Sequence, residues 1–375
     1  MWLVKTAKYQ QVIDWINARI ASGNLKSGDR LETEQEISRQ FGLSRQTVRH
    51  ALGILEQSGT LERIQGSGSY VKERRRDRAA RAVLSKTVTI ISSYVDGYIF
   101  PRLLKSMVET LQKEGYSSRI MFTNNQVEKE RSLLEEILSE RTDDPMIVEP
   151  VMSGLPSPNV EYYREISNRG VPILFFNSFY PELDIPHVCM NDEEAGRIAT
   201  DYVISQGHRR IACIFKADDG QGRYRYKGYL KALHAAGIKI NERQICWIDT
   251  QEQRGMRENS ARILERLEGC SACVCYNDEV AHTLTEICME KRIRIPQELS
   301  VVSIDNSELA QLNGVPLTSV VHPMEVMGKK VAENLLLLIQ NPNYPATYEF
   351  TPEIKVRESV IPASEAVPRE AEETA

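Results

Sequence analysis

The chain has 375 residues, 41% of them hydrophobic and 26% charged, and this length exceeds what one ordinary hydrophobic core accommodates. It has no apolar run of the roughly 18 residues that a membrane span needs, and its N-terminus lacks the apolar core and cleavage site of a signal peptide, so we expect a cytoplasmic protein of two or three domains. The net charge of −5 is unevenly distributed: residues 1–82 carry 15 Lys and Arg against 9 Asp and Glu, and the remainder carries 32 against 43, which favours a polyanionic partner for the first domain alone.

The first domain begins with a series of helical patterns. Apolar residues recur at helical spacing over residues 6–22. Thr33 and the glutamate three residues later form a capping-box pattern, which predicts a second helix that ends at Gly42. Ser44 can cap a third helix over residues 45–58.

A hairpin pattern follows these helices. The stretch LERIQGSGSYVKE alternates as a strand does and is interrupted by Gly66 and Gly68. Three short helices and a hairpin predict an α+β winged helix-turn-helix over residues 1–72. Residues 73–86 are highly charged and have no apolar face to pack, so we interpret them as a linker that can also cross DNA phosphates.

Beyond the linker, short apolar strands alternate with amphipathic helices. This alternation predicts an α/β body of parallel sheets over residues 87–362, with two lobes and a ligand cleft at the carboxyl ends of the strands. The polar, acidic tail at 363–375 is predicted to be disordered. Strands are expected at 87–94, 118–123, 146–150, 171–178, 209–215, 245–250, 272–277 and 299–305, and helices at 101–116, 127–140, 159–169, 192–206, 223–236, 255–268 and 278–291.

The third helix of the first domain has the residues that reading DNA requires. Its apolar residues recur every three or four positions, and Arg45, Gln46 and Arg49 lie off that apolar side in the first turns. Arginine can bond guanine bidentately and glutamine can bond adenine in the same way, while Thr47 can donate to a phosphate. The alternative is a solvated face with incidental arginines, but it leaves the capped helix before and the glycine-tipped hairpin after unexplained.

The stretch LETEQEISRQFGLSRQTVRHALGILEQSGTLERIQGSGSYV resembles the winged-helix signature of the GntR family of bacterial regulators. It departs from that family at Glu32, where proline is usual. The resemblance implies that the third helix faces the major groove, that Glu34 contacts a base or orients an arginine, and that the wing tip lies near the minor groove. The DNA-binding residues predicted on this basis are Glu34, Ser44, Arg45, Gln46, Thr47, Arg49, Gln65, Gly66, Ser67 and Gly68.

Polar and aromatic side chains follow several of the predicted strands. Each of them alone is as readily a helix cap or a loop residue. Their repetition favours a cleft for a small polyol, because a sugar needs aromatic faces for its C–H surfaces and charged or amide groups for its hydroxyls. These residues are Tyr94, Asp96, Tyr98, Phe100, Glu149, Lys216, Asp218, Asp219, Asn277, Asp278, Asp305 and Asn306.

Residues 87–360 resemble the effector domain of the LacI/GalR family, which is itself similar to periplasmic sugar-binding proteins. The resemblance is carried by stretches such as GRYRYKGYLKALHAAGI and IPQELSVVSIDNSELA. It implies that Arg225 and Asp305 hold an effector and that Phe100 is an aromatic platform. His322 stands where that family usually has glutamine.

A GntR-type head fused to a LacI/GalR-type body is similar to the arabinose repressor family of Gram-positive bacteria. The resemblance implies a homodimeric repressor that binds double-stranded operator DNA and is released allosterically by L-arabinose, with no other cofactor, to control pentose utilisation. The residues alone indicate only a small polyol. The resemblances imply most of the effector-binding residues, and the residues at the ends of the predicted strands add Asn277. The predicted effector-binding residues are Tyr98, Phe100, Glu149, Lys216, Arg225, Asn277, Asp305 and His322.

Two other functions are less consistent with the sequence. The spacing of Cys270, Cys273 and Cys275 suggests a metal- or redox-responsive regulator, but no histidine or fourth cysteine stands close by, and a strand face of small cysteines is typical of a core. Catalysis is not predicted, because the sequence contains no G-x-S-x-G elbow, P-loop or H-E-x-x-H motif. We therefore predict neither catalytic nor metal-binding residues.

Overall fold

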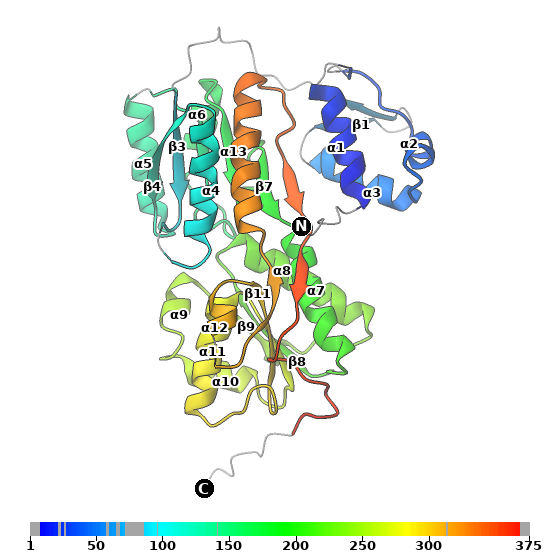
Figure 1. The fold of residues 1–375 in the computed structure, drawn as a ribbon, viewed down its shortest axis with the longest axis vertical. Helices are drawn as coiled ribbons and strands as arrows, with labels where there is room; N and C mark the ends of the chain where they lie inside the picture. The colour runs from blue at the N-terminus through cyan, green and yellow to red at the C-terminus, as the bar shows by residue number, and fades with distance from the viewer. Residues whose placement is uncertain are drawn as a thin grey trace.

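The computed structural model describes residues 8–21, 24–25, 28–57, 60–64, 68–71, 86–95, 97–140, 142–312 and 314–367. A small N-terminal domain (the head, within residues 8–71) lies beside an elongated body (within residues 86–367) that is divided into two lobes (Figure 1). Gln65, Gly66 and Ser67 of the predicted wing tip lie outside the described residues, as does Asp96.

The head has the predicted helices and hairpin. Thr33 and Glu36 form a reciprocal capping box, and Gly42 ends the second helix in the left-handed conformation at φ 64°. Val48 of the third helix is fully buried between the helices. This helix, called the reading helix below, is therefore held in place by its apolar side. The elements are α1 (Lys8–Ala21), α2 (Glu34–Phe41), α3 (Arg45–Gln57), β1 (Leu61–Ile64) and β2 (Gly68–Val71), with β1 antiparallel to β2.

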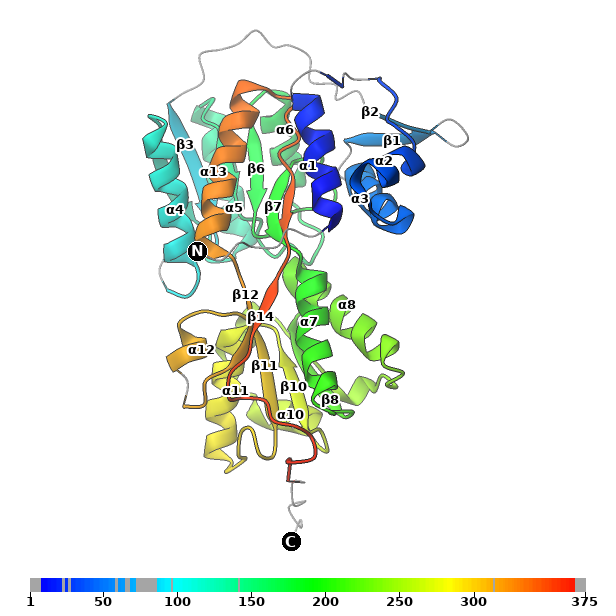
Figure 2. The same ribbon diagram turned by 45° about the vertical axis from the view of Figure 1, so that its right-hand side comes forward.

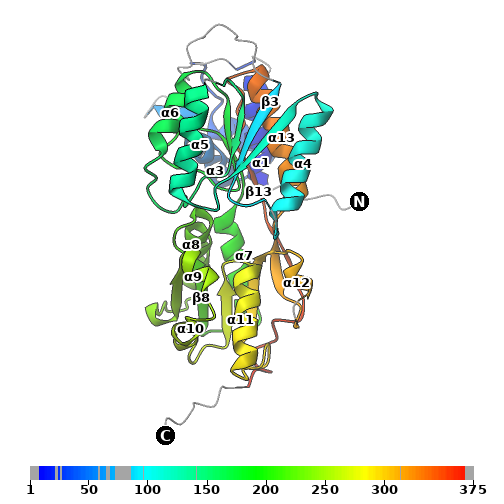
Figure 3. The ribbon, with the colours of Figure 1, turned by 90° about the vertical axis from the view of Figure 1, so that its left-hand side faces the viewer.

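The first lobe, lobe 1, is a parallel sheet between two helical layers. The strands run in the order β13-β7-β6-β5-β3-β4, with α4 and α13 on one face and α5 and α6 on the other (Figure 3). Successive residues of β3, Ile90 and Ile91, are buried on opposite faces in two separate cores. The elements are β3 (Thr87–Ser92), α4 (Phe100–Lys113), β4 (Ser117–Phe122), α5 (Val127–Glu140), β5 (Met146–Val148), α6 (Val160–Asn168), β6 (Ile173–Phe176), β7 (His187–Met190), α13 (Met324–Gln340) and β13 (Tyr348–Phe350).

Lobe 2 has the sheet order β14-β12-β11-β10-β8-β9, parallel except where β14 pairs antiparallel with β12. Across the described residues the chain passes between the lobes at three points: after β7, after β12 and after β13 (Figures 1 and 2). The elements are α7 (Asp192–Ser205), β8 (Ile211–Lys216), α8 (Gly220–Ala235), η1 (Glu242–Gln244), β9 (Ile245–Ile248), α9 (Thr250–Arg254), α10 (Ser260–Arg266), β10 (Ala272–Cys275), α11 (Asp278–Glu290), β11 (Ser300–Asp305), α12 (Leu309–Leu312), β12 (Thr318–Val321) and β14 (Glu353–Lys355).

The structure corrects two boundaries drawn from the sequence. The helix expected over 255–268 is confined to 260–266, and a separate short helix that was not expected, started by an Asp249–Glu252 capping box and ended by Gly255, precedes it at 250–254. The tail expected to be disordered from residue 363 is bound to lobe 2 up to residue 367, where Val367 donates its backbone N–H to Gln297.

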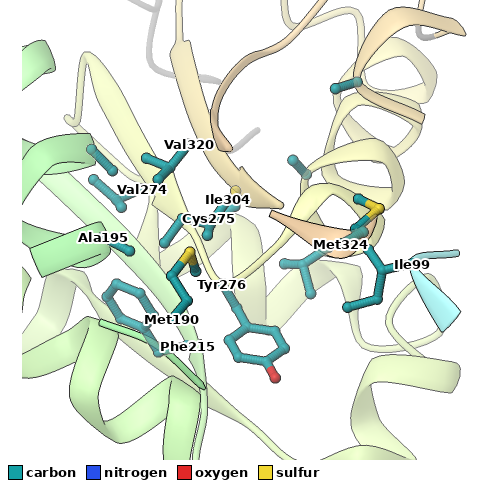
Figure 4. Packing of buried hydrophobic residues seen from close by; sticks show 14 of the residues in the cluster. Ile99, Met190, Ala195, Phe215, Val274, Cys275, Tyr276, Ile304, Val320 and Met324 are labelled. Atoms are coloured by element: carbon teal, nitrogen blue, oxygen red, sulfur yellow. The ribbon is translucent and has the colours of Figure 1, made fainter. Parts of the chain in front are cut away.

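The cysteines of the alternative function belong to the core of lobe 2. Cys273 and Cys275 of β10 are fully buried, and Cys275 lies beside Val274 and Ile304 in Figure 4. Within the described ranges, no group of three or more His, Cys, Asp and Glu side chains is arranged to hold a metal ion. Nor does any described helix combine the length and apolar character needed to cross a membrane.

Candidate DNA-binding face and effector cavity

The start of α3 presents its polar side chains to solvent. Ser44, Arg45, Gln46 and Arg49 are exposed. The apolar stripe on the opposite side of the helix is buried. A helix fixed along one side and open along the other has the shape required to enter a DNA groove.

Glu34 orients two arginines of this face. Its carboxylate accepts from Nη2 of Arg49 at 2.8 Å and from Nη2 of Arg63 at 3.2 Å. These arginines lower the pKa of Glu34, so the carboxylate is charged at neutral pH. Because the Arg49 side chain remains 64% exposed, it can leave Glu34 for a base or phosphate.

Ser44 caps the start of α3, the reading helix. The Ser44 hydroxyl accepts the backbone N–H of Thr47 at 3.1 Å and lies 2.8 Å from the Thr47 hydroxyl.

Gly68, at φ 127°, begins the second wing strand, and a Cβ there would lie 3.1 Å from Nε of Arg30. These residues therefore shape the face, and Arg30 adds a cation beside the wing.

A cavity of about 250 Å³ lies between the lobes, at the carboxyl ends of the strands of both sheets. Of the predicted effector residues, Tyr98, Phe100 and Glu149 line it from lobe 1, and Lys216, Arg225, Asn277 and Asp305 line it from lobe 2. His322 is displaced from the lining but touches it, since its Nε2 lies 3.1 Å from Oδ1 of the lining residue Asn177.

Arg225 is held by groups from different parts of lobe 2. Its Nε donates to Asp192 at 2.7 Å, Nη1 to the Tyr276 carbonyl at 2.7 Å and Nη2 to Asp305 at 3.0 Å. Burial raises the pKa of Asp192 to about 6 in spite of its pairing with Arg225. Because a guanidinium carries five N–H donors, Arg225 can hold both carboxylates and still donate to a ligand.

Helix packing brings Asp192 to Arg225. Gly196 on α7 and Gly228 on α8 each lie directly on the backbone of the other helix: a Cβ at Gly228 would stand 1.9 Å from the Glu193 carbonyl oxygen. Only glycine permits this approach. The short spacing sets the start of α7, where Asp192 lies, against the side of α8 that carries Arg225.

Glu149 is a buried acceptor on the lobe 1 wall. It accepts from the Ser93 backbone N–H at 2.7 Å and from Nδ2 of Asn177 at 2.6 Å. Burial raises the pKa of Glu149 above its usual range, and these hydrogen bonds oppose the rise. The carboxylate is thereby fixed in one orientation toward the cavity.

Lys216 and Tyr276 form the lobe 2 wall. Nζ of Lys216 lies 2.8 Å from Oδ2 of Asp219, to which the Tyr276 hydroxyl also donates at 3.0 Å. The Arg225 guanidinium stands 5.0 Å from the centre of the Tyr276 ring. Figure 4 shows this ring extending out of the core cluster with its hydroxyl at the far end. The cavity therefore combines an aromatic face with cations, as a polyol site requires.

A hydrogen bond across the cleft joins the two lobes at the cavity. The Tyr98 hydroxyl, from lobe 1, donates to Oδ2 of Asp305 at 2.6 Å and accepts the backbone N–H of Asp278 at 3.2 Å. Tyr98 adopts φ 53°, a conformation unfavourable for a residue other than glycine. The lobes are thus closed on one another, and a strained backbone presents the tyrosine that links them.

The sequence prediction missed several lining residues. Asn177 and Tyr276 line the cavity and directly follow β6 and β10. The strand-end pattern, in which polar and aromatic residues follow a strand, had indicated Glu149 and could have indicated these two residues as well. Other strand-end residues are structural instead. Asp218 accepts from the Thr250 hydroxyl at 2.6 Å, Asp278 binds serines of lobe 2, and Asn306 accepts from Arg357.

Comparisons with known proteins agree with both parts of this architecture. Residues 8–71 match the family described as bacterial regulatory proteins, gntR family, and residues 200–360 match the periplasmic binding protein-like domain. The crystal structure of transcription regulator CcpA of Lactococcus lactis superposes with a TM-score of 0.64 at 24% identity, covering 73% of this chain and 98% of that one, and so shares its fold.

Two curated relatives match nearly the whole chain. The arabinose metabolism transcriptional repressor of Geobacillus stearothermophilus is 37% identical over 357 residues, which cover 94% of this chain and 97% of the relative. The protein of the same name from Halalkalibacterium halodurans is 32% identical over 366 residues, covering 95% and 97%. Both alignments are long enough to include the head and the body.

Proposed function

The chain belongs to the family of arabinose metabolism transcriptional repressors, and on that premise we propose that it binds operator DNA as a homodimer which L-arabinose releases. The observation that carries the proposal is Arg225, fixed between Asp192 and Asp305 in a cavity that both lobes enclose. The site is proposed for binding alone: a regulator must release its effector unchanged, so no reaction and no cofactor is assigned.

The cavity supports a small polyol as effector. Arg225 and Lys216 offer N–H donors, Glu149 and Asp305 offer carboxylate acceptors, and the Tyr276 ring offers an apolar face. A pentose has hydroxyls around a ring and C–H groups on its faces, which matches this mixture. The printed names of the relatives supply the choice of arabinose among pentoses.

Exposed apolar side chains on both lobes of the body support the dimer. Phe122 on the edge strand β4 is 54% exposed, and Met289 on α11 and Leu312 on α12 are exposed by more than 70%. These elements lie on the side of the body seen in Figure 3. We propose that a second copy covers these exposed apolar side chains, and a dimer fits the two-fold symmetry of operators.

We propose that the sugar acts by holding the lobes closed. Closure changes where the body places its two heads, so that both reading helices no longer match their half-sites. A coupling of about 1–3 kcal/mol, typical of allostery, would weaken operator binding roughly 5- to 150-fold. Since the operator is chromosomal DNA, we also propose that the protein acts in the cytoplasm.

A gel shift with a panel of sugars tests this function. The purified protein is mixed with its own upstream DNA and with L-arabinose, D-xylose, D-ribose, D-galactose or D-glucose. L-arabinose should release the DNA at the lowest concentration. Equal binding with every sugar absent or saturating would reject the proposal, and release by another sugar alone would reject the effector. Sedimentation of the sugar-free protein as a monomer at the concentration that shifts DNA would reject the dimer.

A further inference from the structure

The head lies against the body through α1, on the side away from its polar reading face. Figures 1 and 2 both show α1 on the side of the head that faces the body. Ile13 on α1 and Leu55 on α3 line one side of a crevice, and Thr347 and Tyr348 line the other. The crevice has a volume of only about 10 Å³, about the volume one water requires. The two faces are therefore in close contact.

Tyr9 on α1 is the polar centre of this contact. Its hydroxyl lies close enough to the side chains of Asn191 and Thr351, where the chain crosses between the lobes, for both to affect its pKa. Burial and the nearby Glu349 carboxylate raise the pKa of Tyr9, while the Asn191 and Thr351 side chains oppose the rise, and the hydroxyl stays protonated. Its ring also packs edge-on against His50 of α3 at 4.8 Å, so the anchor is fixed to the reading helix.

Side chains of opposite charge lie near this anchor without forming an ion pair. Lys330 on α13 lowers the pKa of Asp14 on α1, while burial has the larger and opposite effect. Nζ of Lys330 also lies 4.8 Å from the ring centre of Tyr348 in the crevice wall. The contact thus combines apolar packing with polar and oppositely charged side chains, the combination found in specific interfaces.

On the body, a residue of this contact is adjacent in the chain to a residue that holds the lining of the effector cavity. Asn191 donates to Glu349 at 3.2 Å and caps α7 by accepting the backbone N–H of Glu194 at 2.9 Å. The next residue is Asp192, which holds Arg225 in the cavity lining. A shift in the position of Arg225 can therefore be transmitted to Asn191, which lies beside Tyr9 of the head, because Asn191 and Asp192 are consecutive residues at the start of α7.

We propose that this face of the body, centred on Asn191, Thr347 and Thr351, is a docking site for the chain's own winged helix, occupied when the lobes are closed. Docking leaves the arginines of α3 exposed, so it acts by fixing where the head stands and not by covering its DNA-binding face. The head is then tied to its own body and cannot adjust to the half-site spacing. This inference rests on the proposed function for its effector, whereas the docking contact stands by itself.

Two substitutions weaken the contact without touching the cavity or the reading face. Tyr9→Phe removes the anchoring hydroxyl, and Thr347→Arg places a long cation in the crevice. Asn343→Arg is the matched control, because Asn343 is exposed on the same segment of the body and does not line the crevice. The first measurement is backbone amide hydrogen exchange across α1 in the DNA-free full-length protein, with and without L-arabinose.

Docking predicts that Thr347→Arg accelerates exchange in α1 several-fold, Tyr9→Phe does so to a smaller extent, and Asn343→Arg leaves it unchanged. Equal α1 exchange in Thr347→Arg and wild type under both conditions would overturn the docking. The hydrogen-exchange measurement does not depend on arabinose being the effector, so its outcome is independent of the proposed function.

The second measurement tests the regulatory consequence by fluorescence anisotropy. At saturating L-arabinose, Thr347→Arg should bind operator about 3- to 30-fold more tightly than wild type, and its affinity for L-arabinose should fall by the same factor, because linked equilibria are reciprocal. Without sugar its operator affinity should equal that of wild type. A normal arabinose response in a variant whose α1 exchange is accelerated would overturn the coupling.

Discussion

Oδ1 of Asp192 lies 2.7 Å from Nε of Arg225, although the two residues stand 33 positions apart and on different helices. The contact exists because Gly196 and Gly228 let α7 and α8 pack backbone against backbone. It joins the effector cavity to the point at which the chain crosses from lobe 1 to lobe 2. Several measurable consequences depend on this pair and on the polar face of the head.

Arg225→Lys should weaken L-arabinose binding by about 10-fold or more and abolish sugar-dependent release, while the operator remains bound. Lysine keeps the charge between Asp192 and Asp305 but loses the fixed geometry of the guanidinium, and hydrogen bonds of charged groups contribute about 1.5–3 kcal/mol each. Isothermal titration with L-arabinose and a gel shift measure the two effects. Lys227→Arg, at a solvent-exposed position on the same helix, should behave as wild type. Normal induction of Arg225→Lys would remove this arginine from the site.

Arg49→Ala should weaken operator binding about 5- to 150-fold and leave sugar affinity unchanged, because a bidentate arginine–base contact is worth about 1–3 kcal/mol. Arg169→Ala, which removes an exposed arginine of the body, serves as control for charge. Operator titrations by fluorescence anisotropy at one fixed salt concentration give both values. Equal losses for Arg49→Ala and Arg169→Ala would mean that α3 makes no specific contact.

Gly228→Ala should lower the thermal midpoint of the body by several degrees and weaken L-arabinose binding at the same time. The added Cβ would stand 1.9 Å from a backbone oxygen of α7, which forces the helices apart and costs about 1–3 kcal/mol or more. Gly314→Ala is the control, since a Cβ there has open space. Scanning calorimetry and sugar titration together decide the point, and a stable variant with unaltered affinity would contradict the packing argument.

Asp278 should make the stability of lobe 2 depend on pH. Burial, with repulsion from Asp305, raises the pKa of Asp278 to about 6, so the folded state binds this proton more tightly than the unfolded chain does. The free energy of unfolding should therefore fall as pH rises from about 4 to about 6, by up to about 3 kcal/mol, and then level off. Urea titrations followed by Trp247 fluorescence across that range should show the slope.

Asp278→Asn should remove the slope that this carboxyl contributes. The matched control is Asp143→Asn, at an exposed position on lobe 1. If the unfolding free energy of Asp278→Asn follows the same pH curve as wild type, another group is responsible for the dependence.

The local signals in the sequence were sufficient for much of the architecture. Helical periodicity and the Thr33 capping box predicted the elements of the head, and alternation of strands and helices predicted two lobes of parallel sheet. The strand-end pattern predicted a cleft, and Glu149 and Lys216 from that pattern lie in the cavity lining. Each of these features depends on residues that are neighbours in the chain.

The features that sequence patterns did not predict depend on contacts between segments that are distant in the sequence. Arg225 lies on a helix, where the strand-end pattern gives no signal, and it was placed by resemblance. Its partner Asp192 went unnoticed because the pairing depends on the packing of α7 on α8. The crossing strand β13 and the head-docking face are likewise formed by segments more than a hundred residues apart, and local periodicity carries no information about them.

The order of strands in lobe 1 has a consequence for synthesis on the ribosome. β13, at residues 348–350, forms an edge of the sheet whose other strands are made of residues 87–190. The last strand of the head ends at residue 71, whereas the two lobes cannot complete their sheets until residue 355 has been translated. A prematurely terminated chain would therefore keep a DNA-reading module that no sugar can remove.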